Sequence, residues 1–301
     1  MSYSDRLEAY LMVKNSGLKD AKLIQQAPKE KGMYVPSLIT IRRWIKGNTS
    51  PYSNVNIFEP KPSDSLGFFI GAWLGDGWAD DSDGGKRLFL KVMSESFAKE
   101  FAEAASFILQ KKNSYKLHRL STGGTAWYQV KVTSLLLYSF LVRPLSSLKE
   151  VVVQAPKGFL RGLFTADGNP SVSINRSHSA RRLSVSLCVS NTDAELIRLA
   201  WEVAESLGYH PTKITCGFRG GRPYTIKGKT YRAGSDELQF RIESITEVSR
   251  FLDEIGFADK EKQEKASLAY KLIITYGARK AAEEWERYYV KIGRKWMKRE
   301  G

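Results

Sequence analysis

The middle of the chain repeats one order of hydrophobic patterns. Apolar residues at every second position mark strands, and apolar residues three or four apart mark amphipathic helices. In each repeat an apolar helical run is followed by strands, a helix, further strands and a closing helix, the order αββαββα. The runs after the opening helix are 87–92, 97–109, 115–120, 127–132 and 134–142 in the first repeat, and 183–189, 193–207, 212–216, 237–242 and 245–255 in the second. A repeat of this length is typical of a duplicated unit.

Small residues recur every four positions in the two opening helical runs. Residues four apart lie on one face of a helix. Without side-chain bulk on that face, two helix backbones can approach closely. The pattern therefore predicts that the two opening helices pack against each other. The small residues are Gly71 and Gly75 in the first run, and Gly162 and Ala166 in the second.

Both runs end in Asp-Gly. Gly77 and Gly168 are expected to adopt the left-handed conformation that commonly ends a helix, which places Asp76 and Asp167 at the helix ends. Two copies can bring these carboxylates side by side on a pseudo-twofold axis. Like charges repel at such a site, and a bound cation offsets the repulsion. Paired carboxylates of this kind hold divalent metal for phosphodiester cleavage.

These motifs resemble those of the LAGLIDADG homing endonucleases, in their monomeric two-motif form. The first copy is the more divergent and keeps Gly71, Asp76 and Gly77. The resemblance extends from about residue 64 to about residue 270. It implies an α+β fold in which two pseudo-symmetric αββαββα repeats, 63–150 and 151–270, form a saddle of antiparallel sheets. The second copy matches the family pattern at Leu160, Gly162, Leu163, Ala166, Asp167 and Gly168.

The resemblance implies a site-specific double-strand DNA endonuclease that hydrolyses phosphodiesters at a long asymmetric target and leaves short 3′ overhangs. Mg²⁺ is the expected cofactor, with Mn²⁺ as an alternative and Ca²⁺ as a non-catalytic substitute. Asp76 and Asp167 are the expected metal ligands, with Gly75 and Ala166 as further contacts. A chain that carries both motifs is expected to act as a monomer in intron homing.

The resemblance also implies a basic or polar residue beside each phosphate. Lys91 matches that position in the first repeat, and Cys188 is taken as its second-repeat counterpart. Lys262 matches the lysine that follows the last repeat helix in family members. Its first-repeat partner is left open between Lys149 and Lys157.

The strands are the expected surface for reading DNA, because a β-ribbon can present alternate side chains to base edges in the major groove. Alternation predicts that Lys116 and His118 share a face, as do Gln129 and Lys131. The glycine-rich run 217–234 is expected to form a long hairpin with further contacts. The candidate contacts are Arg87, Lys91, Lys116, Arg119, Gln129, Lys131, Arg176, Arg181, Arg182, Lys213, Arg219, Arg222, Lys227, Lys229, Gln239 and Arg241.

Residues 1–62 precede the repeats and contain three predicted helices, 5–14, 19–27 and 38–46. Ser37 is the expected N-cap of the third, and Gly47-Asn48 ends it. This helix resembles the recognition helix of a helix-turn-helix module, with Arg42 and Arg43 as DNA contacts. The alternative is a small helical cap on the core. Residues 50–63 form the predicted linker.

Charge supports a polyanion partner, since 47 Lys and Arg face 32 Asp and Glu for a net +15. Two cysteines and three histidines at irregular spacing predict neither a disulfide framework nor a zinc site. No apolar run is long enough for a membrane span, and no signal peptide is evident. The expected location is intracellular, in the cytoplasm of a prokaryote or in an organelle. Residues 271–301 form a predicted helical tail.

Two other functions fit the same features. One is an intron RNA-binding splicing maturase, since basic strands also suit RNA. However, the predicted sheets offer few stacking aromatics beyond Phe89, Trp127 and Tyr128. The other is a catalytically silent, sequence-specific DNA-binding regulator. The helix-turn-helix-like start favours it, whereas the presence of both Asp76 and Asp167 argues against it.

Overall fold

The computed structural model describes residues 3–30, 34–46, 58–82, 86–177, 180–226, 229–232, 234–293 and 295–299. Contacts divide the chain into two compact units. The first comprises residues 1–58, 79–88 and 132–142, and the second comprises 59–78, 89–131 and 143–301. The three N-terminal helices belong to the first unit, and both Asp-Gly motifs belong to the second.

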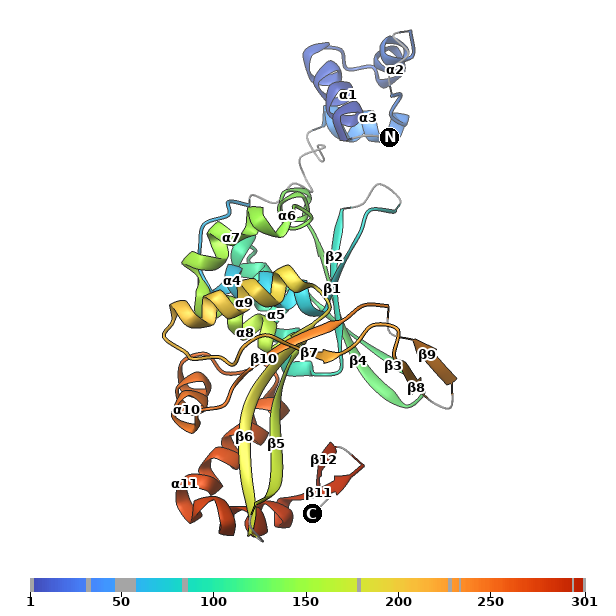
Figure 1. The fold of residues 1–301 in the computed structure, drawn as a ribbon. Coiled ribbons are helices and arrows are strands. Elements are labelled where there is room, and N and C mark those ends of the chain that lie inside the picture. The colour runs from blue at the N-terminus through green and yellow to red at the C-terminus, as the bar shows by residue number, and fades with distance from the viewer. Residues whose placement is uncertain are drawn as a thin grey trace. The chain divides into compact units, whose positions relative to one another are not determined.

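The duplicated αββαββα order is confirmed (Figure 1). The first repeat consists of α4 (Asp64–Asp76), β1 (Gly77–Asp80), β2 (Arg87–Val92), α5 (Glu95–Ile108), β3 (Leu117–Thr122), β4 (Thr125–Thr133) and α6 (Leu135–Leu141). The second consists of α8 (Pro156–Ala166), β5 (Gly168–Ser177), β6 (Ala180–Asn191), α9 (Ala194–Ser206), β7 (Thr215–Phe218), β10 (Glu237–Ile242) and α10 (Ile245–Glu254). The glycine-rich run inserts a hairpin, β8 (Pro223–Ile226) and β9 (Lys229–Arg232), between β7 and β10.

Each repeat contains one four-stranded sheet, and the two sheets have equivalent strand orders, β1-β2-β4-β3 and β5-β6-β10-β7. The β3–β4, β5–β6, β6–β10 and β7–β10 pairings are antiparallel, so the expected α+β class with antiparallel sheets is confirmed. Alternate residues such as Val185, Leu187 and Val189 are buried, which gives each sheet a covered face. The residues between them define the other side, which we call the open face.

The helices α4 and α8 pack through their glycines, as the four-residue spacing predicts. A Cβ on Gly71 would stand 2.8 Å from the backbone nitrogen of Leu163, and one on Gly162 would stand 2.6 Å from that of Ala72. No real Cβ tolerates such contacts, so the backbones themselves touch. The contact is one turn longer than predicted, because Gly67 and Gly158 extend it; a Cβ on Gly158 would clash with the carbonyl oxygen of Asp64.

The predicted left-handed helix ends are wrong. Gly77 has φ −89° and ψ 163°, which is extended, and Gly168 has no positive φ either. The chain passes directly from each helix into a strand and folds tightly against the last turn. A Cβ on Gly77 would lie 2.6 Å from the carbonyl oxygen of Trp73, and one on Gly168 would lie 2.6 Å from the Cα of Phe164. Glycine is needed at both positions because the chain passes so close to the last turn of the helix.

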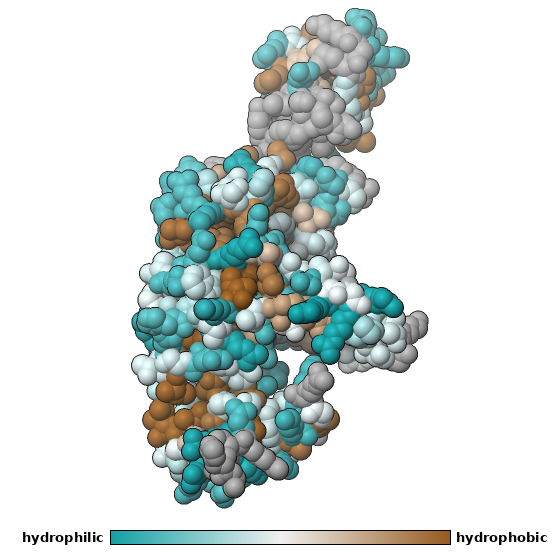
Figure 2. Space-filling model, in the orientation of Figure 1, coloured by the Kyte–Doolittle hydropathy of each residue, from teal (hydrophilic) through white to brown (hydrophobic). Residues whose placement is uncertain are grey.

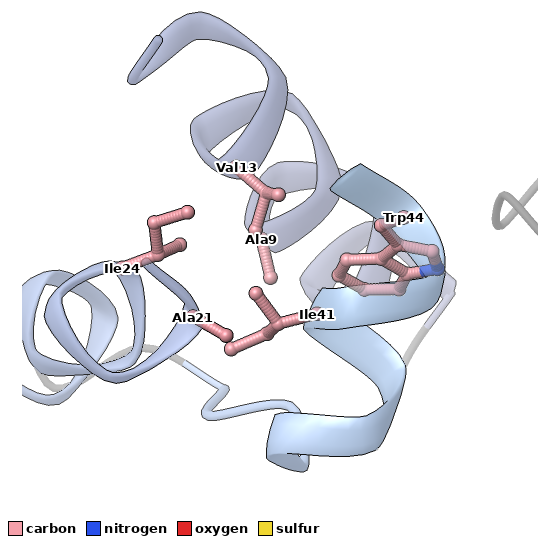
Figure 3. Packing of buried hydrophobic residues seen from close by; sticks show 6 residues of the cluster. All are labelled: Ala9, Val13, Ala21, Ile24, Ile41 and Trp44. Carbon is pink, nitrogen blue, oxygen red and sulfur yellow. The ribbon is translucent and has the colours of Figure 1, made fainter. Parts of the chain in front are cut away.

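Three helices form a small core of their own in the first unit: α1 (Tyr3–Asn15), α2 (Ala21–Glu30) and α3 (Leu38–Ile45). Ser37 caps α3 as predicted, and its hydroxyl accepts a bond from the backbone nitrogen of Thr40 at 3.2 Å. The predicted stop at Gly47-Asn48 and most of the 50–63 linker fall outside the described residues. Figure 3 shows the buried cluster, which is Ala9, Val13, Ala21, Ile24, Ile41 and Trp44.

The C-terminal segment differs from the predicted helical tail. The helix α11 (Lys260–Tyr288) starts before residue 271 and is interrupted at Gly277, which has φ 71°. A hairpin of β11 (Tyr289–Ile292) and β12 (Lys295–Lys298) follows it. Trp285 is fully buried, and its ring stacks on that of Tyr289 with centroids 4.1 Å apart. These aromatics give the hairpin its own anchor on the helix.

One helix, α7 (Leu145–Gln154), joins the repeats and was not predicted.

Figure 2 shows an apolar area over the part of the molecule where Figure 1 draws α11, and Ile274 of α11 is 60% exposed. None of the described helices combines the length and apolar character needed to cross a membrane. Both cysteines, Cys188 and Cys216, are free.

Candidate active site

The structure brings Asp76 and Asp167 together where α4 and α8 end. Asp76 is the last residue of α4, and Asp167 is the C-cap of α8. The carboxylate of Asp167 lies against Gly75, where an added Cβ would stand 2.9 Å from its Oδ2 atom and 2.5 Å from the Cβ of Ala166. Because glycine leaves this space free, the two helix ends can hold their acids next to each other.

Burial acts on both acids, and the charge of Asp76 also acts on Asp167. Burial, with a smaller contribution from the negative charge of Asp76, raises the pKa of Asp167 to about 6, against the opposing effects of the Asn191 hydrogen bond and of Lys262. Partial burial of the carboxyl also raises the pKa of Asp76, and the positive charge of Lys262 again opposes the shift. The site therefore favours a bound cation over two bare carboxylates.

Asn191 orients Asp167, and the sequence reading missed it. Its Nδ2 atom donates to Oδ2 of Asp167 at 2.7 Å. The signal was present, because Asn191 continues the alternation of Val185, Leu187 and Val189 on the covered face, where a polar residue is unusual. Counted back from the following helix, the same place in the first repeat holds the buried Val92. The two acids therefore lie in different surroundings.

Lys262 lies beside both acids, but its ammonium is directed at the backbone. Its Nζ atom donates to the carbonyl oxygens of Thr165 at 2.5 Å, Gly168 at 2.7 Å and Ala166 at 3.3 Å. An ammonium group has three protons, and these three bonds account for all of them. Burial lowers the pKa of this lysine, while the neighbouring acids oppose that shift. Lys262 thus stabilises the C-terminal end of α8 and supplies a fixed positive charge.

Neither lysine considered as the first-repeat partner of Lys262 reaches the acids in this structure. Lys149 forms an exposed ion pair with Glu202 at 2.8 Å. Lys157 forms another with Glu254, also at 2.8 Å. Lys262 is therefore the one of these three lysines whose charge acts on Asp76 and Asp167.

Lys91 lies on the open face of β2, and its Nζ atom lies 5.4 Å from the centre of the Trp127 ring. Its second-repeat counterpart is Ser190, and the assignment to Cys188 is corrected. The N-caps of α5 and α9 are Ser94 and Asp193, and Lys91 and Ser190 each stand three residues before their cap. Cys188 instead donates its thiol to Gln239 at 3.4 Å.

A divalent metal ion fits the donors present. Mg²⁺ prefers oxygen ligands, keeps several waters, and is commonly bound through one or two carboxylates together with substrate phosphates. Asp76 is exposed, and Asp167 uses only its Oδ2 atom in the bond to Asn191. The Ala166 carbonyl already accepts from Lys262, so the two carboxylates are the better ligands of the four expected. In the described part of the chain no three His, Cys, Asp or Glu side chains form a cluster.

The DNA-contact candidates divide by their place on the strands. Gln129 and Lys131 lie two residues apart on β4, as alternation predicts, whereas Lys116 precedes β3 and so does not share a strand with His118, which pairs with Gln129. Arg87 pairs with Asp80 at 3.4 Å. Lys227 is outside the described residues, and only the backbone is described at Arg176 and Lys229. The candidates on or at the edge of the open faces are Arg87, Lys91, Gln129, Lys131, Arg182, Gln239 and Arg241; those in loops are Lys116, Lys213, Arg219 and Arg222.

Two candidates lie on the other face of their strand and are corrected. Arg119 pairs with Tyr128, whose hydroxyl bonds to Glu95 of α5, so both belong to the covered side. Arg181 forms an ion pair with Glu286 of α11, which also lies on that side. A strand shifts every side chain to the opposite face with each residue, so a parity error of one position reverses the assignment.

The fold and the paired acids define a single-chain protein of two αββαββα repeats with one acid from each. Residues 154–256 match the family model of the LAGLIDADG-like domain. The second repeat therefore contains a LAGLIDADG-like domain, and the resemblance to the LAGLIDADG family is confirmed there.

Three known proteins are similar to the chain. An uncharacterized protein of Methanocaldococcus jannaschii is 27% identical over 229 residues, which cover 75% of this chain and 79% of that protein. The structure of I-DmoI in complex with DNA and Mn is 18% identical, covers 64% of this chain and 96% of that one, and gives a TM-score of 0.42. Full-length DUF199/WhiA from Thermatoga maritima is 13% identical, with coverage of 78% and 69% and a TM-score of 0.43.

Proposed function

We propose that the protein is a site-specific endonuclease that cuts both strands of a DNA duplex with a divalent metal ion. The observation that supports this most is the meeting of Asp76 and Asp167, one from each repeat, at the ends of two helices whose backbones touch. Because each repeat supplies one acid, each acid would serve the cleavage of one DNA strand. A single chain supplies both acids, so we propose that it acts as a monomer.

The acids would hold a metal ion, preferably Mg²⁺, together with substrate phosphates. When bound, that ion supplies Lewis-acid chemistry for phosphodiester hydrolysis. Asn191 holds the Asp167 carboxylate in place through its 2.7 Å bond. Lys262 offsets part of the negative charge of the two acids but donates no hydrogen bond to the substrate, because its three protons are bonded to backbone carbonyls. Lys91, exposed on β2, would contact a phosphate.

The open faces would bind the duplex, with the two repeats reading different halves of an asymmetric target. Gln129 and Lys131 represent the first sheet, and Gln239 and Arg241 represent the second. From the family resemblance we propose that the products carry short 3′ overhangs. The three-helix unit would add contacts through Arg42 and Arg43, which are exposed on α3.

The position of Lys262 favours a second candidate, a DNA-binding regulator without cleavage activity. Its buried ammonium attracts both acids, as a metal ion would, and offsets part of their repulsion. A site already supplied with positive charge binds a divalent ion more weakly. In that case the chain would bind its target without metal and leave it intact.

The test begins with selection of bound duplexes from a random DNA library in Ca²⁺, which gives the target without assuming it. The selected duplex is then incubated with the full chain in Mg²⁺, Mn²⁺ or EDTA. A metal-dependent double-strand cut that is lost in Asp76→Asn and Asp167→Asn is the expected result. Glu205→Gln, which changes an exposed acid on α9, is the matched control and should cut normally. Tight binding with no cut in either metal would refute the nuclease and support the regulator.

A further inference from the structure

The open face of the first sheet carries exposed aromatic rings beside the acids. Trp78 follows Asp76 by two residues and is 40% exposed. Its ring stacks on that of Phe89 across β1 and β2, with centroids 5.1 Å apart and an angle of 8° between the planes. The stacked pair leaves part of the indole of Trp78 exposed to solvent. The sequence reading missed Trp78, which comes directly after the Asp-Gly motif.

A second aromatic ring lies on the same sheet and carries a cation. The Trp127 ring is half-buried, and the ammonium of Lys91 lies 5.4 Å from its centre. Leu120, which pairs with Trp127 across β3 and β4, is 37% exposed. Lys131 is two strand steps from Gln129 on this face and is exposed. We call Trp78, Phe89 and Trp127 the aromatic surface; basic side chains border it.

The second sheet has no such rings on the corresponding strands. There, serines face each other across β5 and β6: Ser171 with Ser186 and Ser173 with Ser184, the latter pair joined by a 2.8 Å hydrogen bond. Small hydroxyl groups suit hydrogen bonds to base edges, which a duplex exposes in its major groove. Aromatic rings suit base faces, which a duplex hides by stacking. The two sheets therefore offer different chemistry to a nucleic acid.

We propose that the aromatic surface binds unpaired nucleobases of a single-stranded nucleic acid segment, with Lys91 and Lys131 on the adjacent phosphates. Base-on-aromatic stacking needs a free base face, which only unpaired bases offer. The proposal goes beyond cleavage of a duplex and requires no metal ion. Unpaired RNA and single-stranded DNA share the base faces that the surface would recognise. Contact with the 2′-hydroxyl separates the two sources.

The test uses the full chain in EDTA, where cleavage cannot interfere. Binding of unstructured 12-nucleotide RNA and DNA strands is compared with binding of a 12-base-pair duplex for the wild type and for Trp78→Leu, which keeps apolar volume but removes the ring. We expect about a tenfold weaker Kd for the single strands and a clearly smaller loss for the duplex, because the duplex contacts the same face but offers no free base to the ring. Phe107→Leu, which alters a 67% exposed aromatic on α5, is the matched control.

A second measurement uses the wild type alone. Single strands with 5-iodouridine at one position are photocrosslinked to the chain, and the adduct is located by mass spectrometry. Attachment at Trp78, Phe89 or Trp127 supports the proposal. Attachment elsewhere, or an equal loss of single-strand and duplex binding in Trp78→Leu, overturns it. Preferential crosslinking of RNA or of DNA identifies the source, and neither outcome depends on whether the protein cuts duplexes.

Discussion

Replacing Asp167 by asparagine is expected to stabilise the protein at neutral pH. Burial raises the pKa of this carboxyl from 3.8 to about 6, so the folded state holds the proton more tightly than the unfolded state. Below about pH 4 the carboxyl is protonated in both states, so its burial does not lower the free energy of unfolding. Stability is then lost as the pH rises, and above about pH 6 the full cost of the ionised group remains.

The size of this cost follows from the shift. A difference of about two pKa units corresponds to about 3 kcal/mol of unfolding free energy. Solvent screens part of it because the carboxyl of Asp167 is only half-buried, so we expect about 1–3 kcal/mol. Asparagine cannot ionise, keeps an oxygen that can accept from Asn191, and should recover this amount above pH 6.

The assay is urea unfolding of Asp167→Asn and wild type in EDTA, followed by circular dichroism at pH 4.5 and pH 7.5. The variant should be more stable at pH 7.5, and the difference should shrink strongly at pH 4.5. Glu205→Gln should follow the wild type within about 0.5 kcal/mol at both pH values. A variant that is less stable at pH 7.5, or a difference independent of pH, would show that the carboxyl is not strained by burial.

Four further changes test other parts of the structure. Gly71→Ala should cost about 1–3 kcal/mol in urea unfolding because its Cβ meets backbone, whereas Gly234→Ala, which meets nothing within 4 Å, should be near neutral. Trp285→Ala removes a fully buried ring and should cost about 3–5 kcal/mol, with limited proteolysis cutting the C-terminal hairpin first; unchanged resistance would contradict this. Lys262→Met should raise the pKa of Asp167 in a carboxyl-resolved NMR titration. No rise would show that the charge of Lys262 does not act on Asp167. Millimolar Mg²⁺ should raise the Tm of the wild type at pH 7.5 more than that of Asp167→Asn, and an equal effect would place the ion elsewhere.

The strands were predicted well because one of their faces is covered. Arg87–Val92 and Glu237–Ile242 match the predicted 87–92 and 237–242, since alternating burial leaves a period that a sequence shows directly. The packing of α4 on α8 could also be predicted, because only small residues four positions apart allow two helix backbones to approach so closely. In contrast, α7 was not predicted although Leu148, Val151 and Val152 have helical spacing, because its N-cap, Pro144, gives no side-chain capping signal for the start of a helix.

The candidate site was predicted in its acids and less well in their partners. Asp-Gly at the end of a helix suggests a left-handed cap, but only the three-dimensional path shows that Gly77 continues into a strand. Asn191 and Lys262 meet at Asp167 from distant parts of the chain, and spacing in sequence gives no measure of that approach. Likewise, the direction of the Lys262 ammonium depends on three carbonyls that no side-chain pattern reveals.

The contact between α4 and α8 places few requirements on the sequences of the two repeats. It is formed by backbone atoms, and it requires little of the facing side chains except their absence at Gly67, Gly71, Gly158 and Gly162. A repeat from a relative with the same small residues would therefore fit its new partner along α4 and α8, provided that it keeps contacts such as that of Arg161 on α8 with Glu100 on α5. Recombination between such chains could change one binding face completely and leave the two acids where they are.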